Sequence, residues 1–211
     1  MICPWCYIGK RRLDRALAMS AGGLAGSAPV QIRWRPFQLN PGMASGGMDR
    51  KAYLAWKFGG ADRVGSVYDR IVEEGRQDGI AFAFERITRT PNTVDAHRAI
   101  LFAQNHGAAD DLVEALFAAY FTAGRDIGDC DELAAIGGAC GLDQAPLREY
   151  LRSEAGLAEV IASNERAHAL GINAVPCFVF DGRKALSGAQ PPEVFLRLFD
   201  FARSQAENVV S

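Results

Sequence analysis

The sequence predicts an α/β fold that a long block of helices interrupts. Three features lead to this prediction: a helical pattern near the N-terminus, short strand patterns toward both ends of the chain, and helix-forming sequence throughout the middle. The chain has 211 residues, which suits one domain or one domain with an insert. Its hydrophobic fraction of 49% and charged fraction of 23% are those of a globular protein and exclude a disordered or collagen-like chain.

The first helix is expected to start directly after Cys3. Pro4 suits the first helical turn, where its missing N–H would have no partner in any case. Apolar residues recur at helical spacing on one face, and three basic residues lie on the other: Ile8, Leu13 and Leu17 against Lys10, Arg11 and Arg12. We expect this helix to end by Gly22–Gly23.

A strand is expected at residues 30–35, where apolar and polar side chains alternate before Pro36 and Pro41. Helical patterns then occupy the stretch from Asp49 to Leu151. The expected helices cover residues 49–56, 62–77, 94–105, 108–122 and 129–141, and a sixth follows residue 143. Their expected capping residues are Asp49, Asn92 or Thr93, Asp129 and Asp143.

The pattern becomes mixed again near the C-terminus. A helix is expected at 157–170, followed by an apolar strand at 174–180. Asp181–Gly182 is a hairpin turn signal that leads into a return strand at 184–187, and a last helix is expected at 193–206. We therefore divide the chain into a first α/β part (residues 1–45), a helical insertion (46–153) and a second α/β part (154–211).

Two cysteines stand at the start of the first helix, in Cys3-Pro4-Trp5-Cys6. Free backbone N–H groups and the positive end of the helix dipole stabilise a thiolate at Cys3, so its pKa should fall below about 8.5. Cys6 lies one turn later, where its sulfur can form a disulfide with the first. This arrangement is typical of thiol–disulfide exchange, with Cys3 attacking a disulfide and Cys6 resolving the mixed intermediate.

Two other interpretations of the cysteine pair stay open. The pair could supply half of a zinc site, but a second pair of ligands is then needed, and Cys130 and Cys140 are too widely spaced to provide it. The spacing could also arise by chance in an ordinary helix. The proline between the cysteines and the amphipathic helix behind them favour redox chemistry, so we predict no metal.

A thiol–disulfide enzyme also needs an open backbone edge beside the attacking sulfur, so that a substrate segment can lie across it. A cis-proline at the start of a strand supplies such an edge. Val175–Pro176 opens the predicted apolar strand and is the best candidate. Since about 5–6% of X–Pro bonds in folded proteins are cis, the residues alone do not establish this assignment.

Several segments spread along the chain carry a resemblance to a known family. They are Cys3-Pro4-Trp5-Cys6-Tyr7-Ile8-Gly9, Arg33-Trp34-Arg35-Pro36-Phe37-Gln38-Leu39-Asn40-Pro41, Asn92-Thr93 with Ala96-His97-Arg98, and Gly171 to Pro176 with Ser187-Gly188-Ala189-Gln190-Pro191. In this order they resemble the DsbA-like thioredoxin family, and within it the cytoplasmic FrnE-like oxidoreductases.

The resemblance implies a thioredoxin-like fold with an all-helical insertion and a cis bond before Pro176 that faces the dithiol. Asn92, Thr93 and His97 would lie near the cleft, although Asn92-Thr93 is also an ordinary N-cap and His97 also suits a packing role. We assign substrate contacts to Pro4, Trp5, Val175, Pro176 and His97. The implied substrate is a protein or small-molecule disulfide or dithiol. No cofactor is implied beyond the redox-active Cys3–Cys6 disulfide, although glutathione is allowed.

A sister branch contains 2-hydroxychromene-2-carboxylate isomerase and the kappa-class glutathione transferases. In that branch serine typically replaces the first cysteine, and a late Gly-Ser/Asn-Asp-Arg segment helps hold glutathione. This chain has Cys3 at the first position and Ser187-Gly188-Ala189-Gln190 late in the sequence. Both differences argue against the isomerase, and a glutathione-dependent isomerase or transferase is kept as the alternative function.

The beginning of the chain departs from the thioredoxin pattern, in which a central strand directly precedes the active-site helix. Met1 and Ile2 are too few to form that strand. The strands at Val30 and Cys177 would then face each other across a gap, and each buried unpaired backbone group would cost about 1–3 kcal/mol. We therefore expect an apolar strand to be encoded upstream of Met1.

The other cysteines are expected to be structural. Strand alternation turns Cys177 away from Pro176 and into packing, so a role as a third redox thiol is the less favoured interpretation. A helix between Cys130 and Cys140 would hold their Cα atoms about 15 Å apart, beyond the limit of about 7 Å for a disulfide. Four aromatic residues are assigned to the core: Trp34, Phe37, Phe117 and Phe121.

Charge and hydropathy limit the partners and the location. A net charge of −2 gives no sign of a basic surface, so no nucleic-acid partner is predicted. No apolar run approaches the roughly 20 residues that span a bilayer, and no signal-peptide pattern precedes the cysteines. Five cysteines, an odd number, do not form a secreted disulfide framework. We expect a cytoplasmic protein that is a monomer or a homodimer.

Overall fold

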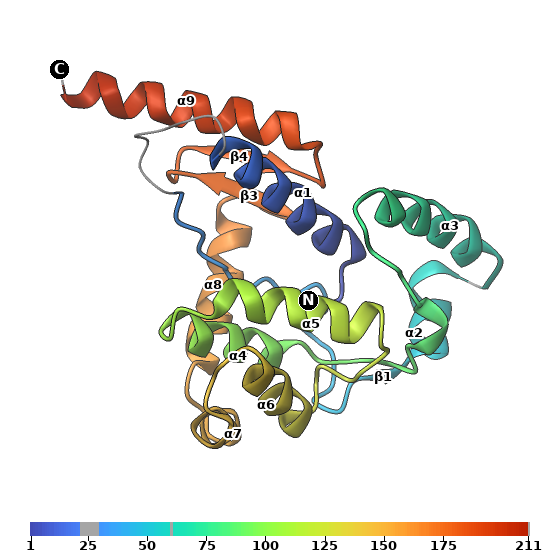
Figure 1. The fold of residues 1–211 in the computed structure, drawn as a ribbon. Coiled ribbons are helices and arrows are strands. Elements are labelled where there is room, and N and C mark those ends of the chain that lie inside the picture. The colour runs from blue at the N-terminus through green and yellow to red at the C-terminus, as the bar shows by residue number, and fades with distance from the viewer. Residues whose placement is uncertain (22–29, 60, 211) are drawn as a thin grey trace.

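The computed structural model describes residues 1–21, 30–59 and 61–210. A β-hairpin with its flanking helices forms one side of the molecule, and a larger group of helices forms the other (Figure 1). Helix α1 (Pro4–Ala21) lies between them, against α9 (Pro192–Val210) on one side and α5 (Ala109–Phe121) on the other. None of the helices in the described ranges is long and apolar enough to cross a membrane.

The remaining elements follow the predicted order closely. The helices are α2 (Arg50–Phe58), α3 (Ala61–Gln77), α4 (Val94–Gln104), α6 (Cys130–Ala139), α7 (Gln144–Arg152) and α8 (Leu157–Ala169), with a 3-10 turn, η1 (Phe84–Arg86). A two-residue bridge joins β1 (Met48–Asp49) to β2 (Arg89–Thr90), and the hairpin consists of β3 (Cys177–Phe180) and β4 (Lys184–Ser187). The domain boundaries after residues 45 and 153 stay a prediction.

Side-chain caps begin the helices where the sequence places them. The Asp49 carboxylate accepts from the N–H of Ala52 at 2.9 Å, and Asp143 accepts from that of Ala145 at 3.0 Å. Asp129 accepts from two N–H groups in the first turn of α6, each at 2.9 Å. At α4 the capping hydrogen bond comes from Asn92, whose side-chain oxygen accepts from Val94 N–H at 2.9 Å. Thr93, the other predicted cap, makes no side-chain capping hydrogen bond.

The strand predicted at residues 30–35 is absent, and this prediction is wrong. The segment is extended, with alternating exposure, but no strand pairs with it in the described part of the chain. A helix side chain supplies a hydrogen bond there instead, because Gln104 Oε1 accepts from Trp34 N–H at 2.9 Å. Just beyond the segment, Asn164 Oδ1 accepts from Gln38 N–H at 2.9 Å. Backbone groups that lie against a core need partners, and side chains of α4 and α8 meet that need here.

Two of the three basic residues on the predicted polar face of α1, Lys10 and Arg12, are largely buried. Lys10 is 4% exposed, and its ammonium group lies 2.8 Å from the Asp14 carboxylate and 3.3 Å from that of Glu114. The reason is the position of α1 between two layers, which buries most of its circumference (Figure 1). The expected helix end at Gly22–Gly23 lies outside the described residues.

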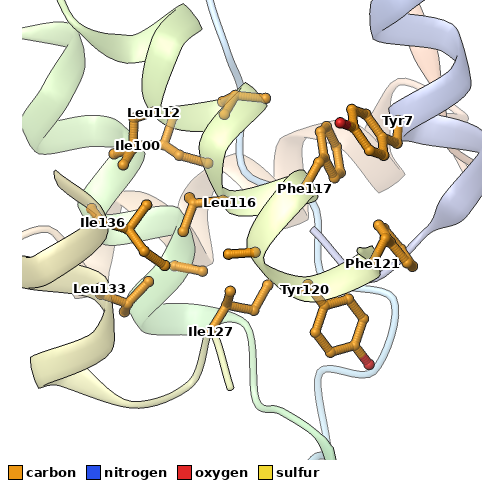
Figure 2. Packing of buried hydrophobic residues seen from close by; sticks show 14 of the residues in the cluster. Tyr7, Ile100, Leu112, Leu116, Phe117, Tyr120, Phe121, Ile127, Leu133 and Ile136 are labelled. Carbon is orange, nitrogen blue, oxygen red and sulfur yellow. The ribbon is translucent and has the colours of Figure 1, made fainter. Parts of the chain in front are cut away.

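Helix α5 is the centre of the larger core (Figure 2). Phe117 and Phe121 are buried as predicted, and Tyr7 of α1 stacks on Phe117 with ring centroids 5.2 Å apart. Trp34 and Phe37 are half-buried rather than buried. Trp34 packs at the edge of this core, and Phe37 lies against His168 of α8, with ring centroids 5.2 Å apart. The Tyr7 contact therefore joins the cysteine-bearing helix to the helical group.

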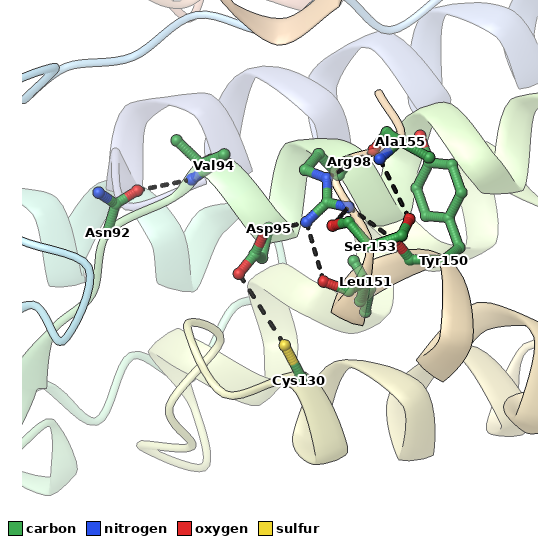
Figure 3. A network of polar contacts seen from close by, with 9 residues as sticks. All are labelled: Asn92, Val94, Asp95, Arg98, Cys130, Tyr150, Leu151, Ser153 and Ala155. Atoms are coloured by element: carbon green, nitrogen blue, oxygen red, sulfur yellow. Dashed lines mark hydrogen bonds and ion pairs between the residues drawn. The ribbon is translucent and has the colours of Figure 1, made fainter. Parts of the chain in front are cut away.

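A buried arginine joins several helices of this group (Figure 3). The Arg98 guanidinium donates to the carbonyl oxygens of Tyr150, Leu151, Ser153 and Ala155 and forms an ion pair of 2.7 Å with Asp95. These carbonyls lie at and just beyond the C-terminus of α7, where a helix leaves acceptors unpaired. Arg98 thus caps α7 and fixes it to α4.

The C-terminal hairpin confirms the predicted turn. Asp181 and Gly182 both have positive φ, at 48° and 67°, as a tight hairpin turn requires. Strand β3 begins at Cys177 rather than Ala174, because the ladder starts only after Pro176, which has no N–H to donate. Phe178 packs edge-on against Phe195 of α9 at 4.8 Å, and this contact places α9 and α1 on the same face of the hairpin.

Candidate active site

The two cysteines of the motif lie at the N-terminus of α1. Pro4 is the first residue of the helix, and the N–H of Cys6 donates to the carbonyl of Cys3 at 3.0 Å. Cys3 therefore precedes the first turn, and Cys6 lies within it. No disulfide bond joins them in this structure.

The two thiols have opposite electrostatic environments. A hydrogen bond from the Cys6 thiol, together with the N–H groups of Cys6 and Trp5, lowers the pKa of Cys3 to about 7, although burial opposes the shift. The same hydrogen bond, together with burial, raises the pKa of Cys6 well above its ordinary value. At pH 7 about half of Cys3 is therefore ionised, and the thiolate form accepts a hydrogen bond from the Cys6 thiol.

The attacking cysteine is the more buried of the two residues. Cys3 is 9% exposed, whereas Cys6 is half-buried. The segment before β3 covers Cys3, because the Cys3 sulfur lies 3.7 Å from the carbonyl oxygen of Val175, within hydrogen-bonding distance for a thiol. A reacting disulfide therefore has to approach Cys3 next to the Val175 backbone.

The Val175–Pro176 peptide bond is cis. Close packing against α1 holds this segment beside the cysteines: a Cβ atom added to Gly9 would lie 3.1 Å from Pro176 Cγ and 3.2 Å from Phe178 Cζ. Glycine at this position thus allows the helix to approach the proline. Gly9 was not among the predicted site residues, although it lies three residues after Cys6 and is therefore its neighbour on the helix surface.

Arg12, three residues after Gly9, is a second site residue that was not predicted. Its guanidinium donates to the carbonyl oxygen of Ala189 at 2.7 Å and forms ion pairs with Glu74 at 2.6 Å and Asp78 at 2.7 Å. The N–H of Gly188 donates to the carbonyl of Pro176 at 2.8 Å. The loop at residues 187–190 is therefore held by α1 and in turn holds Pro176.

The other predicted contact residues have different surroundings. Trp5 is half-buried, and the Arg70 guanidinium of α3 lies 5.9 Å from its ring centroid. His97 is 6% exposed and lies 3.1 Å from the carbonyl oxygen of Phe37. Burial lowers the pKa of His97 to about 3, so the ring is neutral and donates from Nε2 to that carbonyl. His97 thus supports the extended segment, as the packing interpretation expects.

Three further cysteines lie elsewhere. Helix α6 is continuous between Cys130 and Cys140, which is the condition under which no disulfide between them was expected, and both thiols are free. Burial raises the pKa of Cys130, Cys140 and Cys177, so these thiols are weaker nucleophiles than Cys3 at neutral pH. In the described ranges, no three His, Cys, Asp or Glu side chains gather in a way that could hold a metal ion.

The structure places a dithiol at a helix N-terminus beside a cis-proline and adds a group of helices to the fold. These features are typical of a thioredoxin-like protein with a dithiol site. A family model described as a DSBA-like thioredoxin domain matches residues 1–200, and the chain belongs to that family. The family supports an oxidoreductase or a related enzyme. The predicted thioredoxin-like fold and DsbA-like membership are thus confirmed.

Solved structures agree with this assignment. A probable DsbA oxidoreductase from Streptomyces coelicolor, SCO1869, is 31% identical, with a TM-score of 0.83 over 96% of this chain and 86% of that one. The cytosolic disulfide reductase DsbM from Pseudomonas aeruginosa is 19% identical, with a TM-score of 0.61 over 99% and 94% of the two chains. A 2-hydroxychromene-2-carboxylate isomerase is 16% identical, with a TM-score of 0.66 over 98% and 94%. These last two likenesses concern the fold alone.

Proposed function

We propose that the protein catalyses thiol–disulfide exchange, with Cys3 as the nucleophile and Cys6 as the resolving thiol. The observation that carries this proposal is the opposite shift of two neighbouring pKa values, with Cys3 lowered to about 7 and Cys6 raised. A nucleophile has to be a thiolate near neutral pH, and a resolving thiol has to stay protonated until the first step is complete.

In the proposed reduction, the Cys3 thiolate attacks one sulfur of a substrate disulfide. A Cys3–substrate bond forms, the substrate disulfide breaks, and one substrate thiolate leaves and takes up a proton. Cys6 then loses its proton and attacks the Cys3 sulfur. The Cys3–Cys6 disulfide forms and the second substrate thiol is released, so the substrate gains two electrons that a cellular dithiol must later restore to the enzyme.

The substrate is proposed to dock along the backbone at Val175 and Pro176, with Trp5 beside it. This part of the proposal is supported by the 3.7 Å distance from the Cys3 sulfur to the Val175 carbonyl oxygen. The substrate class is a protein or small-molecule disulfide. A reducing location such as the cytoplasm fits a dithiol of this kind, and DsbM, which shares the fold, is named a cytosolic disulfide reductase.

The test is reduction of insulin disulfides, together with oxidation of a model dithiol by the oxidised protein. We expect Cys3→Ser to lower both rates to background and Cys6→Ser to trap a mixed disulfide on Cys3. Cys140→Ser is the matched control, because this half-buried thiol lies on the helical insert, and it should leave both rates unchanged. Full activity in Cys3→Ser would reject the proposal.

A further variant, Cys6→Ala, distinguishes thiol–disulfide exchange from the alternative function. A glutathione-dependent isomerase needs one group to activate glutathione and no resolving thiol. It would therefore bind glutathione tightly and keep its isomerase activity in Cys6→Ala. Exchange chemistry predicts that the resolving step is lost in that variant.

A further inference from the structure

One face of α1 contacts the substrate-docking segment along its length. Cys6, Gly9 and Arg12 follow one another at three-residue spacing, so each is a neighbour of the next in a row that winds along the helix surface. Gly9 allows van der Waals contact with Pro176, and Arg12 reaches the carbonyl of Ala189 beyond it. The helix that carries the dithiol thus also fixes the distance to the docking segment.

The Arg12 side chain is held firmly in this position. It is 12% exposed, and its carboxylate partner Asp78 is 1% exposed. Three different nitrogens are used: Nε binds Asp78, Nη2 binds Glu74, and Nη1 binds the Ala189 carbonyl. A planar guanidinium can serve three such acceptors at once, whereas an ammonium group on a flexible stem cannot hold the same fork.

The bond to Ala189 continues to the docking segment through one residue. Gly188 precedes Ala189, and its N–H donates to the Pro176 carbonyl at 2.8 Å. Displacing the Ala189 carbonyl would therefore move the partner of Pro176. Since the backbone at Val175 is where an extended substrate is proposed to lie, a small displacement there affects substrate alignment.

We propose that Arg12 is a positioning residue that holds the docking segment against the dithiol and thereby favours extended peptide disulfides over small ones. The inference rests on the proposed exchange function. An extended peptide uses the docking backbone, in the manner of an added strand, and loses affinity when that backbone shifts. A small disulfide without a backbone needs only access to the Cys3 sulfur.

The experiment compares Arg12→Gln and Arg12→Lys with a matched control, Arg15→Gln. Arg15 pairs with the same Asp78 carboxylate at 2.8 Å, is 56% exposed, and has no contact with Ala189 among its hydrogen bonds and ion pairs with described residues. The substrates are an extended peptide with one disulfide and 2-hydroxyethyl disulfide. Circular dichroism establishes that each variant folds, and the pH profile of Cys3 alkylation reports on the nucleophile itself.

For Arg12→Gln we expect KM for the peptide to rise about tenfold, which equals about 1.4 kcal/mol and matches the loss of one charge-assisted hydrogen bond. KM for 2-hydroxyethyl disulfide and the alkylation profile should change less than about twofold, within the spread expected of a residue remote from the sulfur. Arg12→Lys should lie between wild type and Arg12→Gln, and Arg15→Gln should match wild type on both substrates.

If Arg12→Gln does not fold because Asp78 is left buried with one cation fewer, the double variant Arg12→Gln/Asp78→Asn removes that charge and is measured in its place, with Asp78→Asn as its own control. Equal changes on both substrates, or a peptide KM like that of the control, would overturn the positioning role while leaving the exchange function intact. Retained activity in Cys3→Ser would instead overturn the exchange function.

Discussion

Removing the Cys6 thiol should make alkylation of Cys3 slower at low pH and faster at high pH. The Cys6 thiol is the main source of the lowered Cys3 pKa, so Cys6→Ala should return that pKa to about 8.5 or above. At pH 6 a thiol of pKa about 7 is about 9% ionised, and one of pKa 8.5 is about 0.3% ionised, which is a loss of about 30-fold in thiolate.

The gain in nucleophilicity offsets part of that loss. With a Brønsted slope of about 0.4–0.5, a thiolate whose pKa is 1.5 units higher attacks about fivefold faster. The net expectation is alkylation that is about sixfold slower at pH 6 and about fourfold faster at pH 9.5, so the two rate profiles cross between these values.

The assay is iodoacetamide alkylation followed by mass spectrometry, which assigns the label to Cys3. Cys6→Ser is the matched variant, because its hydroxyl can still donate to the Cys3 sulfur, and it should lie between wild type and Cys6→Ala. A Cys6→Ala protein that alkylates as fast as wild type at pH 6 would refute the reasoning that the second thiol stabilises the first as an anion.

Three further outcomes follow from the packing. Gly9→Ala should lower stability and slow exchange, because its Cβ would crowd Pro176 at 3.1 Å, whereas Gly65→Ala, with open space at its Cβ, should be neutral or stabilising in the same urea titration. Between pH 6.5 and pH 3 the His97 ring is protonated in the unfolded chain but neutral in the folded chain. The free energy of unfolding should therefore fall by about 2 kcal/mol from pH 7 to pH 5. Urea unfolding of His97→Gln at both pH values should lack this decrease. Arg98→Met should cost about 3–5 kcal/mol in urea unfolding, since Asp95 and the carbonyls that end α7 lose their shared partner, and a cost below 1 kcal/mol would contradict the capping role.

Features that depend on neighbouring residues could be predicted from the sequence. The caps at Asp49, Asp129 and Asp143 are local, because an acidic side chain reaches N–H groups two or three residues ahead. The Asp181–Gly182 turn is local as well, since its backbone conformation follows from two residue types. The dithiol spacing belongs to the same class, because one helical turn joins Cys3 to Cys6.

Features that depend on distant partners could not be predicted. The alternation at residues 30–35 is real and survives as alternating exposure, but a period of two indicates an extended backbone and not a strand ladder. Whether the ladder forms depends on a neighbouring strand, and here Gln104, far along the chain, takes the hydrogen bond of Trp34 N–H. The Arg12 contact with Ala189 is equally remote in sequence.

The buried charges of α1 help to identify which groups lower the pKa of Cys3. The three basic residues that follow the motif invite the idea that positive charge lowers the Cys3 pKa. Yet Lys10 is paired with Asp14 and Glu114, and Arg12 with Glu74 and Asp78, so their charges are compensated within a few ångströms. The Cys3 pKa is lowered instead chiefly by the Cys6 thiol, with smaller contributions from the amides of Cys6 and Trp5 and from the N-terminal ammonium group. Substituting Lys10 or Arg12 should therefore leave the Cys3 alkylation profile in place, whereas substituting Cys6 should move it.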